Sequence, residues 1–418
     1  MSAIPRASAL APFQVRSFRY QWPADLATSF ALEMEIIILG WYVLVETQSV
    51  FLLTVYASLH HLGTLLGPFF GVAGDRVGQR NLLCGMRMFY TLTSSTLMVC
   101  AFTGVLNPYL VLVIAAFSGM VRPSDIGMRN AVISEIMPAN QLLSASGIQR
   151  TTQDAARIAG SLTGAGLMAA LGMANAYIAI ACLYATSAWL TLQAGRARVA
   201  VTNAPPRIER ESPWRELKEG VSYVWRTPHI KALMCLALVL NGTAFPIFSS
   251  LLPYVVKEIY NGTQTTLATL VACGSVGALL GSILVSRFNG SISPARLMIF
   301  ASCSWLVMLI IFSHMEGPAW GAPALFFAGM SQASALVPMT TILLRHTDPH
   351  YRGRVMGIRM LMIYSNMPGI LLFGPVVTTL GYTPTVILYC LSSLAGVLMI
   401  TVAWRAQLWR ADAPSNAR

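Results

Sequence analysis

Ionisable side chains lie inside several long apolar segments, where charge is costly, and five of them are the candidates for proton coupling. Glu33 and Glu35 belong to one such segment, and Arg122, Asp125 and Arg129 belong to another. A charge in the middle of a membrane costs about 2.5–3.5 kcal/mol, so such residues usually mark functional positions. A carboxylate beside a guanidinium can take up a proton and release its partner. We therefore expect one glutamate to bind a proton in competition with a contact to Arg122 or Arg129.

Helical spacing decides which of these side chains share a face. At 3.6 residues per turn, Asp125 lies about 60° and Arg129 about 20° from Arg122 around the axis, so the three line one face. A static ladder of ion pairs is the alternative interpretation. Glu33 and Glu35 are about 200° apart, so we expect only one of them to face a cavity opposite these arginines. The other is then held by a neighbouring helix or keeps its proton.

The elements that position these residues are apolar segments of membrane-spanning length. Of 418 residues, 55% are hydrophobic and 11% charged, whereas a soluble chain carries about 25% charged residues. A transmembrane helix needs about 20 mostly apolar residues. The sequence predicts an all-α membrane protein with twelve spans, at about residues 22–45, 50–74, 82–104, 109–133, 148–171, 174–193, 231–256, 265–286, 295–313, 321–345, 356–379 and 384–404.

Positive charge is distributed unevenly among the loops between these spans. The net charge is +12, but the Arg residues recur singly between apolar runs, so we expect no nucleic-acid partner. One set of alternate loops holds a single basic residue, Lys257, and the opposite set, in which we count Arg87, holds most of the arginines. The positive-inside rule then predicts a multi-pass protein of a bacterial-type cytoplasmic (inner) membrane with both termini cytoplasmic.

An internal repeat divides the chain into two similar halves. Gly71 and Gly281 are 210 positions apart, and Gly172 and Gly381 are 209 apart. Repeats of this size are typical of alternating-access carriers, whose site lies between the halves near the membrane midplane. We expect a cytoplasmic N-terminal segment (1–21), two six-helix bundles (22–193 and 231–404), a cytoplasmic linker with an amphipathic helix (194–230) and a cytoplasmic tail (405–418).

The helix expected in the linker has a clear start and a periodic apolar face. Ser212-Pro213 is a helix-start signal, and Trp214, Leu217, Val221 and Val224 recur at helical spacing. We expect this helix to lie on the inner membrane face with its basic residues toward lipid headgroups. A solvated linker helix is the alternative.

A short motif joins the second and third predicted spans: Gly71-Val-Ala-Gly-Asp75-Arg76-Val-Gly78-Gln79-Arg80. It resembles the signature loop of the major facilitator superfamily, G-x-x-x-D-R-x-G-R-[RK], with Gln79 as the one departure. The resemblance implies two pseudo-symmetric six-helix bundles and secondary active transport without a cofactor. The segments FRYQW, AARIAG and RGRVMG are similar to the branch with macrolide efflux and enterobactin export proteins, which implies proton-coupled export.

The same loop is predicted to act as a gate. Asp75, at the cytoplasmic end of the second span, can face the N-terminus of the eleventh span, where helix-dipole charge and Arg359 are positive. This contact would exist only while the halves are closed on the inside, and would stabilise the outward-facing state. Alternatively, Asp75 and the arginines only anchor the loop to headgroups. The predicted gating residues are Gly71, Asp75, Arg76, Gly78, Arg80 and Arg359.

Polar and aromatic side chains in the apolar segments are candidates for solute contact. The set comprises His60, Asn241, Phe245, Gln332, Tyr364 and Asn366. Together with 21 Met and 17 Phe, these residues suit a large, partly apolar solute better than a sugar or a phosphate. Packing is the alternative role for each residue, and a neutral imidazole bonded across helices is the alternative for His60.

Three functions agree with these observations. The first is export of a small amphipathic molecule by alternating access, coupled to protons. The second is a lysophospholipid or lipid flippase, and the third is a non-transporting sensor or scaffold, which the intramembrane acids disfavour. The seven Cys lack metal-binding spacing and no HExxH, GxSxG or P-loop pattern occurs, so we expect no enzyme, metal or cofactor. The expected partners are a small-molecule substrate, protons and the lipid bilayer, and the protein is expected to be a monomer.

Overall fold

The protein is a bundle-forming, all-helical membrane chain. The computed structural model describes residues 11–138, 141–194, 213–287, 293–348 and 351–410, which form helices and no strand. Among these residues, eight helices are long and apolar enough to cross a membrane. The predicted all-α membrane fold is therefore confirmed. The count of twelve spans stays a prediction, because several predicted spans fall on shorter helices or on two parts of one helix.

The chain divides into two compact units, and the structure describes part of each. The first unit comprises Met1–Thr47 and Leu59–Ile208, and the second comprises Gln48–Ser58 and Glu209–Arg418. The beginning of the second predicted span therefore packs with the second unit, whereas the rest of that span belongs to the first.

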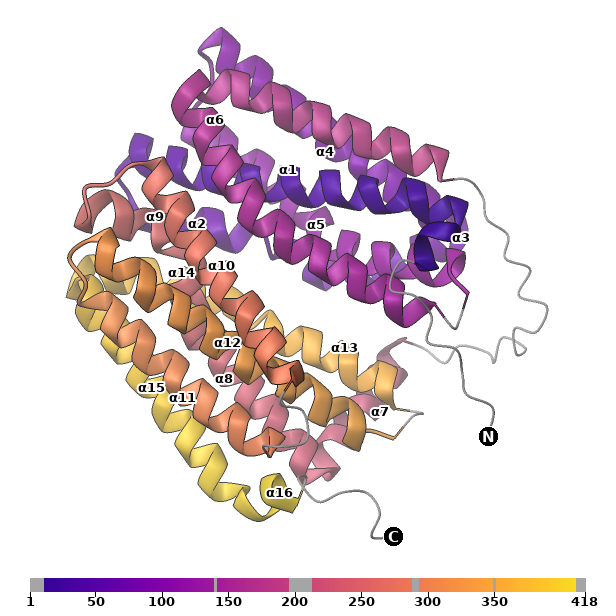
Figure 1. Cartoon of the computed structure of the whole chain (residues 1–418), viewed down its shortest axis with the longest axis vertical. Coiled ribbons are helices and arrows are strands. Elements are labelled where there is room, and N and C mark those ends of the chain that lie inside the picture. Colours follow the sequence, from indigo (N-terminus) through magenta and orange to yellow (C-terminus); the bar gives the residue numbers. More distant parts are fainter. Residues whose placement is uncertain (1–10, 139–140, 195–212, 288–292, 349–350, 411–418) are drawn as a thin grey trace. The chain divides into compact units, whose positions relative to one another are not determined.

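Long helices lying side by side build the first unit (Figure 1). Its elements are η1 (Ala11–Gln14), α1 (Arg16–Thr47), η2 (Leu62–Leu66), α3 (Gly67–Val77), α4 (Gln79–Thr103), α5 (Pro108–Ile136) and α6 (Leu142–Gln193). Helix α6 packs along both α1 and α4. Helix α5 begins where the sequence predicts a start, because Pro108 occupies its first turn and the Asn107 side chain accepts a hydrogen bond from the Leu110 amide at 2.8 Å.

The second unit is built in the same way from shorter and broken helices. Its elements are α2 (Val50–Leu59, which ends in the first unit), α7 (Pro213–Arg226), α8 (Pro228–Ser250), α9 (Leu252–Tyr254), the π-helical turn η3 (Val255–Ile259), α10 (Gln264–Arg287), α11 (Pro294–Ser313), α12 (Pro318–His346), α13 (Arg352–Ile363), α14 (Asn366–Leu380), α15 (Tyr382–Ala403) and α16 (Arg405–Arg410). Helix α7 lies where the amphipathic helix was predicted, and residues 195–212 of the linker lie outside the described part of the chain.

The internal repeat is visible in the backbone at two equivalent glycines. Gly172, inside α6, has φ +79° and ψ 171°, and Gly381, between α14 and α15, has φ +83° and ψ 168°. This conformation is open essentially only to glycine. Positions 209 residues apart thus turn the chain in the same way, between the fifth and sixth and between the eleventh and twelfth predicted spans.

A second pair of equivalent glycines brings helices close together. A Cβ atom at Gly160 of α6 would lie 2.9 Å from the Phe30 carbonyl oxygen of α1, and one at Gly369 of α14 would collide with the Gly242 carbonyl group of α8. The spacing is again 209 residues. Each unit therefore contains the same close helix pair, built on a small residue as is common in membrane bundles.

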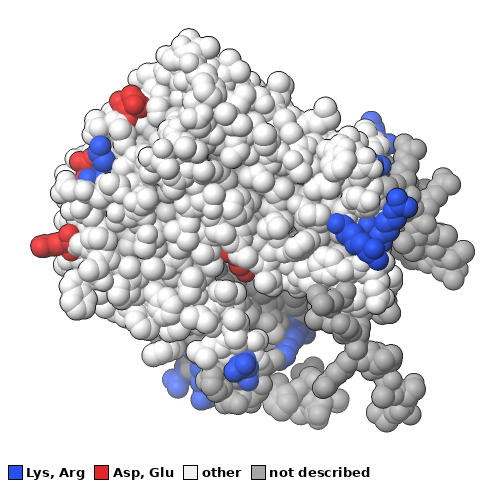
Figure 2. Space-filling model, turned by 45° about the horizontal axis from the view of Figure 1, so that its top comes forward, with Lys and Arg blue, Asp and Glu red and all other residues white. Residues whose placement is uncertain are grey.

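Much of the surface of the described residues is apolar, as expected for a protein embedded in lipid. Large apolar side chains are exposed on many helices, including Phe102, Phe300, Leu372 and Val402. On the face shown in Figure 2, most of the surface carries no charged side chain. Exposed apolar surface of this extent marks contact with a membrane rather than with water.

Candidate functional site

A small cavity lies within the first unit. It is lined from α1 by Glu35 and two leucines, from α4 by Tyr90, and from α5 by Arg122 and its neighbours; the full lining is Leu32, Glu35, Leu39, His60, Tyr90, Ile114, Ala115, Ser118 and Arg122. Its volume of about 10 Å³ is enough for one water molecule. The cavity thus joins one carboxylate, one guanidinium and one imidazole around a site of water size.

Glu35 is held in this cavity by the opposite helix. The Tyr184 hydroxyl of α6 donates a hydrogen bond to Glu35 Oε2 at 3.0 Å. The ring of Tyr184 packs against that of Tyr90, with 5.4 Å between centroids. Glu35 thus has a hydrogen-bond donor on α6 and shares the cavity with the Arg122 guanidinium of α5.

Glu33 lies on the other side of α1. Its Oε1 atom is 3.8 Å from Nε of Arg157 on α6, and its side chain is 21% exposed. The two glutamates thus differ as their spacing around the helix requires: Glu35 lines the cavity with Arg122, and Glu33 forms an ion pair with α6. Exposure weakens an ion pair of this kind, so Glu33 is less suited to switch the unit between two states.

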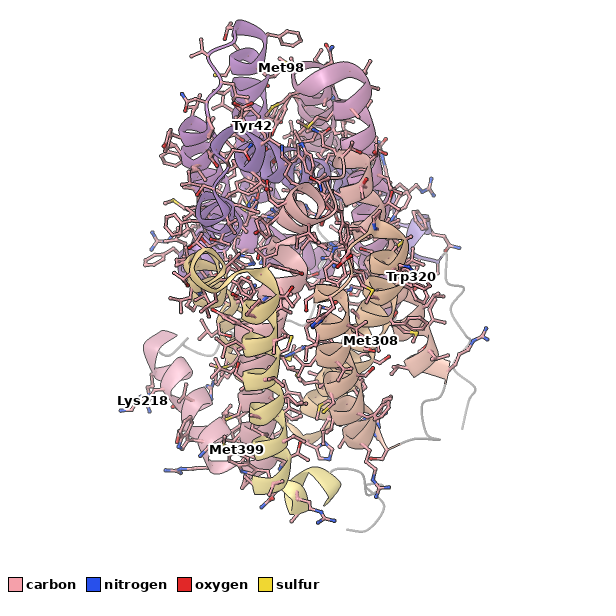
Figure 3. All side chains as sticks on the ribbon, turned by 90° about the vertical axis from the view of Figure 1, so that its left-hand side faces the viewer. Tyr42, Met98, Lys218, Met308, Trp320 and Met399 are labelled. Carbon is pink, nitrogen blue, oxygen red and sulfur yellow. The ribbon has the colours of Figure 1, made fainter. Side chains whose placement is uncertain are left out.

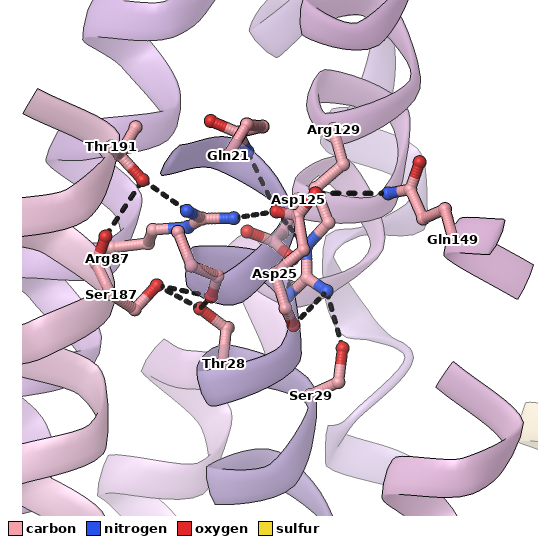
Figure 4. Close-up of polar contacts among 11 residues, drawn as sticks. Gln21, Asp25, Thr28, Ser29, Arg87, Asp125, Arg129, Gln149, Ser187 and Thr191 are labelled. Atoms are coloured by element: carbon pink, nitrogen blue, oxygen red, sulfur yellow. Dashed lines mark hydrogen bonds and ion pairs between the residues drawn. The ribbon is translucent and has the colours of Figure 1, made fainter. Parts of the chain in front are cut away.

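A second group of charges, here named the four-charge cluster, comprises Asp25, Arg87, Asp125 and Arg129 (Figure 4). Arg87 of α4 pairs with Asp25 Oδ1, and Arg129 Nη2 of α5 lies 2.6 Å from Asp125 Oδ2. Arg129 Nε also lies 3.9 Å from Asp25 Oδ1. At most 3% of each side chain is exposed. Two positive and two negative charges therefore balance one another in the interior.

Polar neighbours complete the coordination of the four-charge cluster. Gln21 donates to Asp25 Oδ1 at 2.8 Å, and Arg129 Nη1 donates to the Ser29 hydroxyl at 2.7 Å. Arg87 also donates to the Thr191 hydroxyl of α6. Breaking a buried pair by removing one partner costs about 3–5 kcal/mol. The cluster thus ties α1, α4, α5 and α6 together, which favours a structural role over proton exchange.

The predicted arginine face of α5 is divided along the helix between these two sites. Arg122 lines the cavity, whereas Asp125 and Arg129 belong to the four-charge cluster. Arg122 and Arg129 are seven residues, or about 10 Å, apart along the axis. Asp25 and Glu35 are separated in the same way on α1, by about 15 Å.

Sequence reasoning did not assign several residues of these sites, among them Asp25, Tyr90 and Tyr184, and it misplaced Arg87. Tyr184 was not singled out, and Arg87 was counted among the basic residues of the loops; this is corrected by its fully buried position on α4. The predicted third span, 82–104, already contained Arg87, so the error was to count this residue with the loops although it lies within a span. Helix α4 begins at Gln79, which places Arg87 in its third turn. Its place inside the apolar run was the signal that could have identified it as an interior charge.

The residues of the signature motif lie around the junction of α3 and α4. Gly78 separates the two helices, and Arg80 donates to the carbonyl oxygens of Thr191, at 2.9 Å, and Leu192 at the end of α6. Arg76 is exposed. Gly71 and Asp75 lie on α3, but the surroundings of Asp75 fall outside the described side chains; Arg359 lies on α13 of the second unit. Arg80 thus fixes the start of α4 to the end of α6.

The proposed solute contacts of the second unit are spread over its helices. Asn241 of α8, Gln332 of α12 and Asn366 of α14 are buried, and Phe245 and Tyr364 are half-buried. The Asn241 amide donates to the Ala237 carbonyl oxygen of its own helix at 2.8 Å. His60, the remaining candidate, lines the Glu35 cavity of the first unit instead.

Comparison with known proteins finds one family model and several efflux proteins that resemble this chain. The sequence model of the Major Facilitator Superfamily matches residues 22–367. Macrolide efflux protein A of Streptococcus pyogenes is 24% identical over 386 residues, 91% of each chain. The multidrug efflux pump Tap of Mycolicibacterium fortuitum is 23% identical over 389 residues, 91% of this chain and 94% of that one.

Solved structures share the fold at low sequence identity. The nucleoside transporter NupG has a TM-score of 0.72 at 13% identity, covering 93% of this chain and 99% of that one. An auto-inhibited POT family peptide transporter has a TM-score of 0.73 at 11% identity, covering 96% and 98%. At this level of identity, the similarity to these structures shows a shared fold only.

Proposed function

Because this chain belongs to the Major Facilitator Superfamily, and is therefore a multi-pass membrane transporter and not an enzyme, we propose that it exports a small amphipathic molecule from the cell in exchange for protons. Its relatives named as macrolide and multidrug efflux proteins support the direction and the class of solute. The many Met and Phe residues of the spans support a partly apolar solute. Asn241, Phe245, Gln332, Tyr364 and Asn366 are the proposed contacts.

The proposed orientation places both termini in the cytoplasm of a bacterial-type cell, with the protein in its cytoplasmic membrane. It is supported by the concentration of Lys and Arg in one set of alternate loops. The monomer is proposed as the working unit, since the two repeats within one chain supply both halves of an alternating-access carrier.

The observation that supports the proton coupling is the placement of Glu35 in the cavity with Arg122, where it accepts a hydrogen bond from Tyr184. While Glu35 is charged, it is attracted to Arg122 across a site of low dielectric. Proton uptake removes this attraction and leaves Arg122 to interact with other groups. A change of this kind biases a two-state protein toward one of its states. The four-charge cluster is less suited, because each of its carboxylates has a guanidinium partner.

The signature motif is proposed to stabilise the outward-facing state through Asp75 and Arg359. The support is chemical: Asp75 is negative, Arg359 of α13 is positive, and the N-terminus of a helix carries partial positive charge from its dipole. The contact of Arg80 with the end of α6 would hold the motif in place during the cycle.

The test is transport by the purified full-length chain in liposomes with an imposed pH gradient. A fluorescent macrolide serves as the solute and an internal dye reports pH. We expect coupled solute and proton movement by the wild type and loss of the pH dependence in Glu35→Gln, because glutamine cannot exchange a proton. Glu33→Gln is the matched control and should keep the pH dependence. Full pH dependence in Glu35→Gln would show that the proton binds elsewhere.

The same liposomes separate the alternative functions. A lipid flippase would move a fluorescent lysophospholipid between leaflets and leave the macrolide untouched. A sensor or scaffold would move neither solute and no protons. Either outcome would overturn the proposed export.

A further inference from the structure

Helix α7 has one face fixed to the second unit and the opposite face exposed. On the fixed face, Glu219 Oε2 lies 2.8 Å from Arg354 Nη1 of α13. The ring of Tyr223 stacks on that of Tyr351, with 4.3 Å between centroids and 5° between planes. The Tyr223 hydroxyl also accepts a hydrogen bond from the Asp348 amide at 3.1 Å. These contacts set the rotation of α7 about its axis and so decide which side chains point outward.

The exposed face carries both apolar and basic side chains. Trp225 is 66% and Val221 43% exposed. Lys218 is exposed on the same face, and Arg226 is exposed beside this face at the last residue of the helix. Trp225 and Lys218 are seven residues, or about 20°, apart around the helix. Figure 3 shows Lys218 pointing away from the rest of the second unit. A face that combines an exposed indole with cationic groups is typical of helices that lie in a membrane interface.

The direct connection of α7 to the apolar helix α8 indicates where the end of α7 lies relative to the membrane. Helix α7 ends at Arg226, and α8 begins two residues later at Pro228 as an apolar span. Trp225 therefore lies at the membrane boundary, where indole rings are enriched. From the first turn of α8, Lys231 places its ammonium group 4.3 Å from the Trp225 ring centroid. Lys231 thus lies against the Trp225 ring at the membrane boundary, Arg226 follows Trp225 at the end of α7, and Lys218 lies two turns earlier on the same side of α7 as Trp225.

We propose that this face of α7 binds the headgroups of anionic phospholipids. The phosphodiester is the matching group, because it is anionic and sits at the boundary that the indole ring marks. Each Lys or Arg near an anionic membrane surface strengthens binding by about fivefold. The ion pair of Glu219 with Arg354 connects this site to α13, so lipid binding fixes the position of a helix that precedes the break between α13 and α14. This inference does not depend on the solute or on proton coupling.

The test uses the full-length protein in vesicles of phosphatidylcholine containing phosphatidylglycerol, with bromine on the chains of one lipid or the other. Bromine quenches nearby indole fluorescence, and the difference between wild type and Trp225→Phe isolates the Trp225 signal. We expect brominated phosphatidylglycerol to quench this signal more than brominated phosphatidylcholine does. Lys218→Gln and Arg226→Gln should each lower the preference about fivefold.

Two residues of the second unit that lie far from α7 in the sequence, Trp320 and Lys257, serve as matched controls. Trp320 is 74% exposed and lies in the first turn of α12, at the other end of that helix from His346 and the segment that leads to Tyr351. The signal isolated with Trp320→Phe should therefore be quenched equally by both lipids. Lys257→Gln removes the same charge from η3 and should leave the Trp225 preference unchanged. Equal quenching of Trp225 by both lipids, or quenching by neither, would overturn the proposal. Loss of the preference on adding inorganic phosphate would assign the site to the free anion instead.

Discussion

The hydroxyl of Tyr184 on α6 donates a hydrogen bond to Glu35 on α1, with 3.0 Å between the two oxygen atoms. A donor of this kind stabilises the charged carboxylate more than the protonated acid. In the proposed proton coupling, Tyr184 would therefore affect the pH at which Glu35 exchanges its proton.

Replacing this donor is expected to shift the pH profile of transport. In Tyr184→Phe the charged form of Glu35 loses a hydrogen bond, so the protonated form persists to higher pH. We expect the pH of half-maximal transport to rise by about one to two units, since a hydrogen bond to a charged group contributes about 1.5–3 kcal/mol. Tyr177→Phe removes a buried hydroxyl two turns earlier on α6 and should leave the profile in place. An unchanged profile in Tyr184→Phe would exclude Tyr184 from this role.

The two turning glycines should be equally sensitive to substitution. Alanine at Gly172 or Gly381 would be forced into a backbone conformation essentially restricted to glycine, at a cost of about 1–3 kcal/mol. We expect Gly172→Ala and Gly381→Ala each to lower the unfolding temperature by a similar amount. Gly166→Ala, in regular helix with open space around its Cβ position, is the control and should be neutral or slightly stabilising. A loss at one glycine alone would contradict the structural equivalence of the repeats.

Arg80 is expected to act first through the end of α6. Its guanidinium binds the carbonyl oxygens of Thr191 and Leu192, which the end of a helix leaves without intrahelical donors. Arg80→Gln should lower the free energy of unfolding by about 1–2 kcal/mol, whereas Arg76→Gln, at an exposed position, should change it by less than about 0.5 kcal/mol. Transport per folded molecule then tests the gating role. A stability change of the same size in both variants would contradict the helix-end role of Arg80.

Much of the first unit could be predicted from local patterns. At 3.6 residues per turn, Glu33 and Glu35 must lie on nearly opposite faces of their helix, and Arg122 and Arg129 must lie on the same face of theirs. The glycine repeat likewise indicated two equivalent halves. These are properties of single helices or of sequence periodicity, so no knowledge of helix neighbours was needed.

The partners of those side chains could not be predicted in the same way. Tyr184 reaches Glu35 across 149 positions of sequence, and Arg87 reaches Asp25 across 62. Both contacts depend on which helices pack together and at what height. Arg87 lay within the predicted third span, but its burial follows only from the contacts of α4 with α1 and α6.

The four-charge cluster gives a prediction that separates structure from proton coupling. Arg87→Met leaves Asp25 buried without its main partner, and we expect it to destabilise the protein by about 3–5 kcal/mol. Adding Asp25→Asn removes the uncompensated charge, so the double variant should regain much of the lost stability, as a double-mutant cycle in thermal unfolding would measure. Because Glu35 and Arg122 are intact in the double variant, its transport should keep the wild-type pH dependence. Loss of that dependence in a stable double variant would instead place the exchanged proton in the cluster, and additive stability losses would show that Arg87 and Asp25 are not coupled.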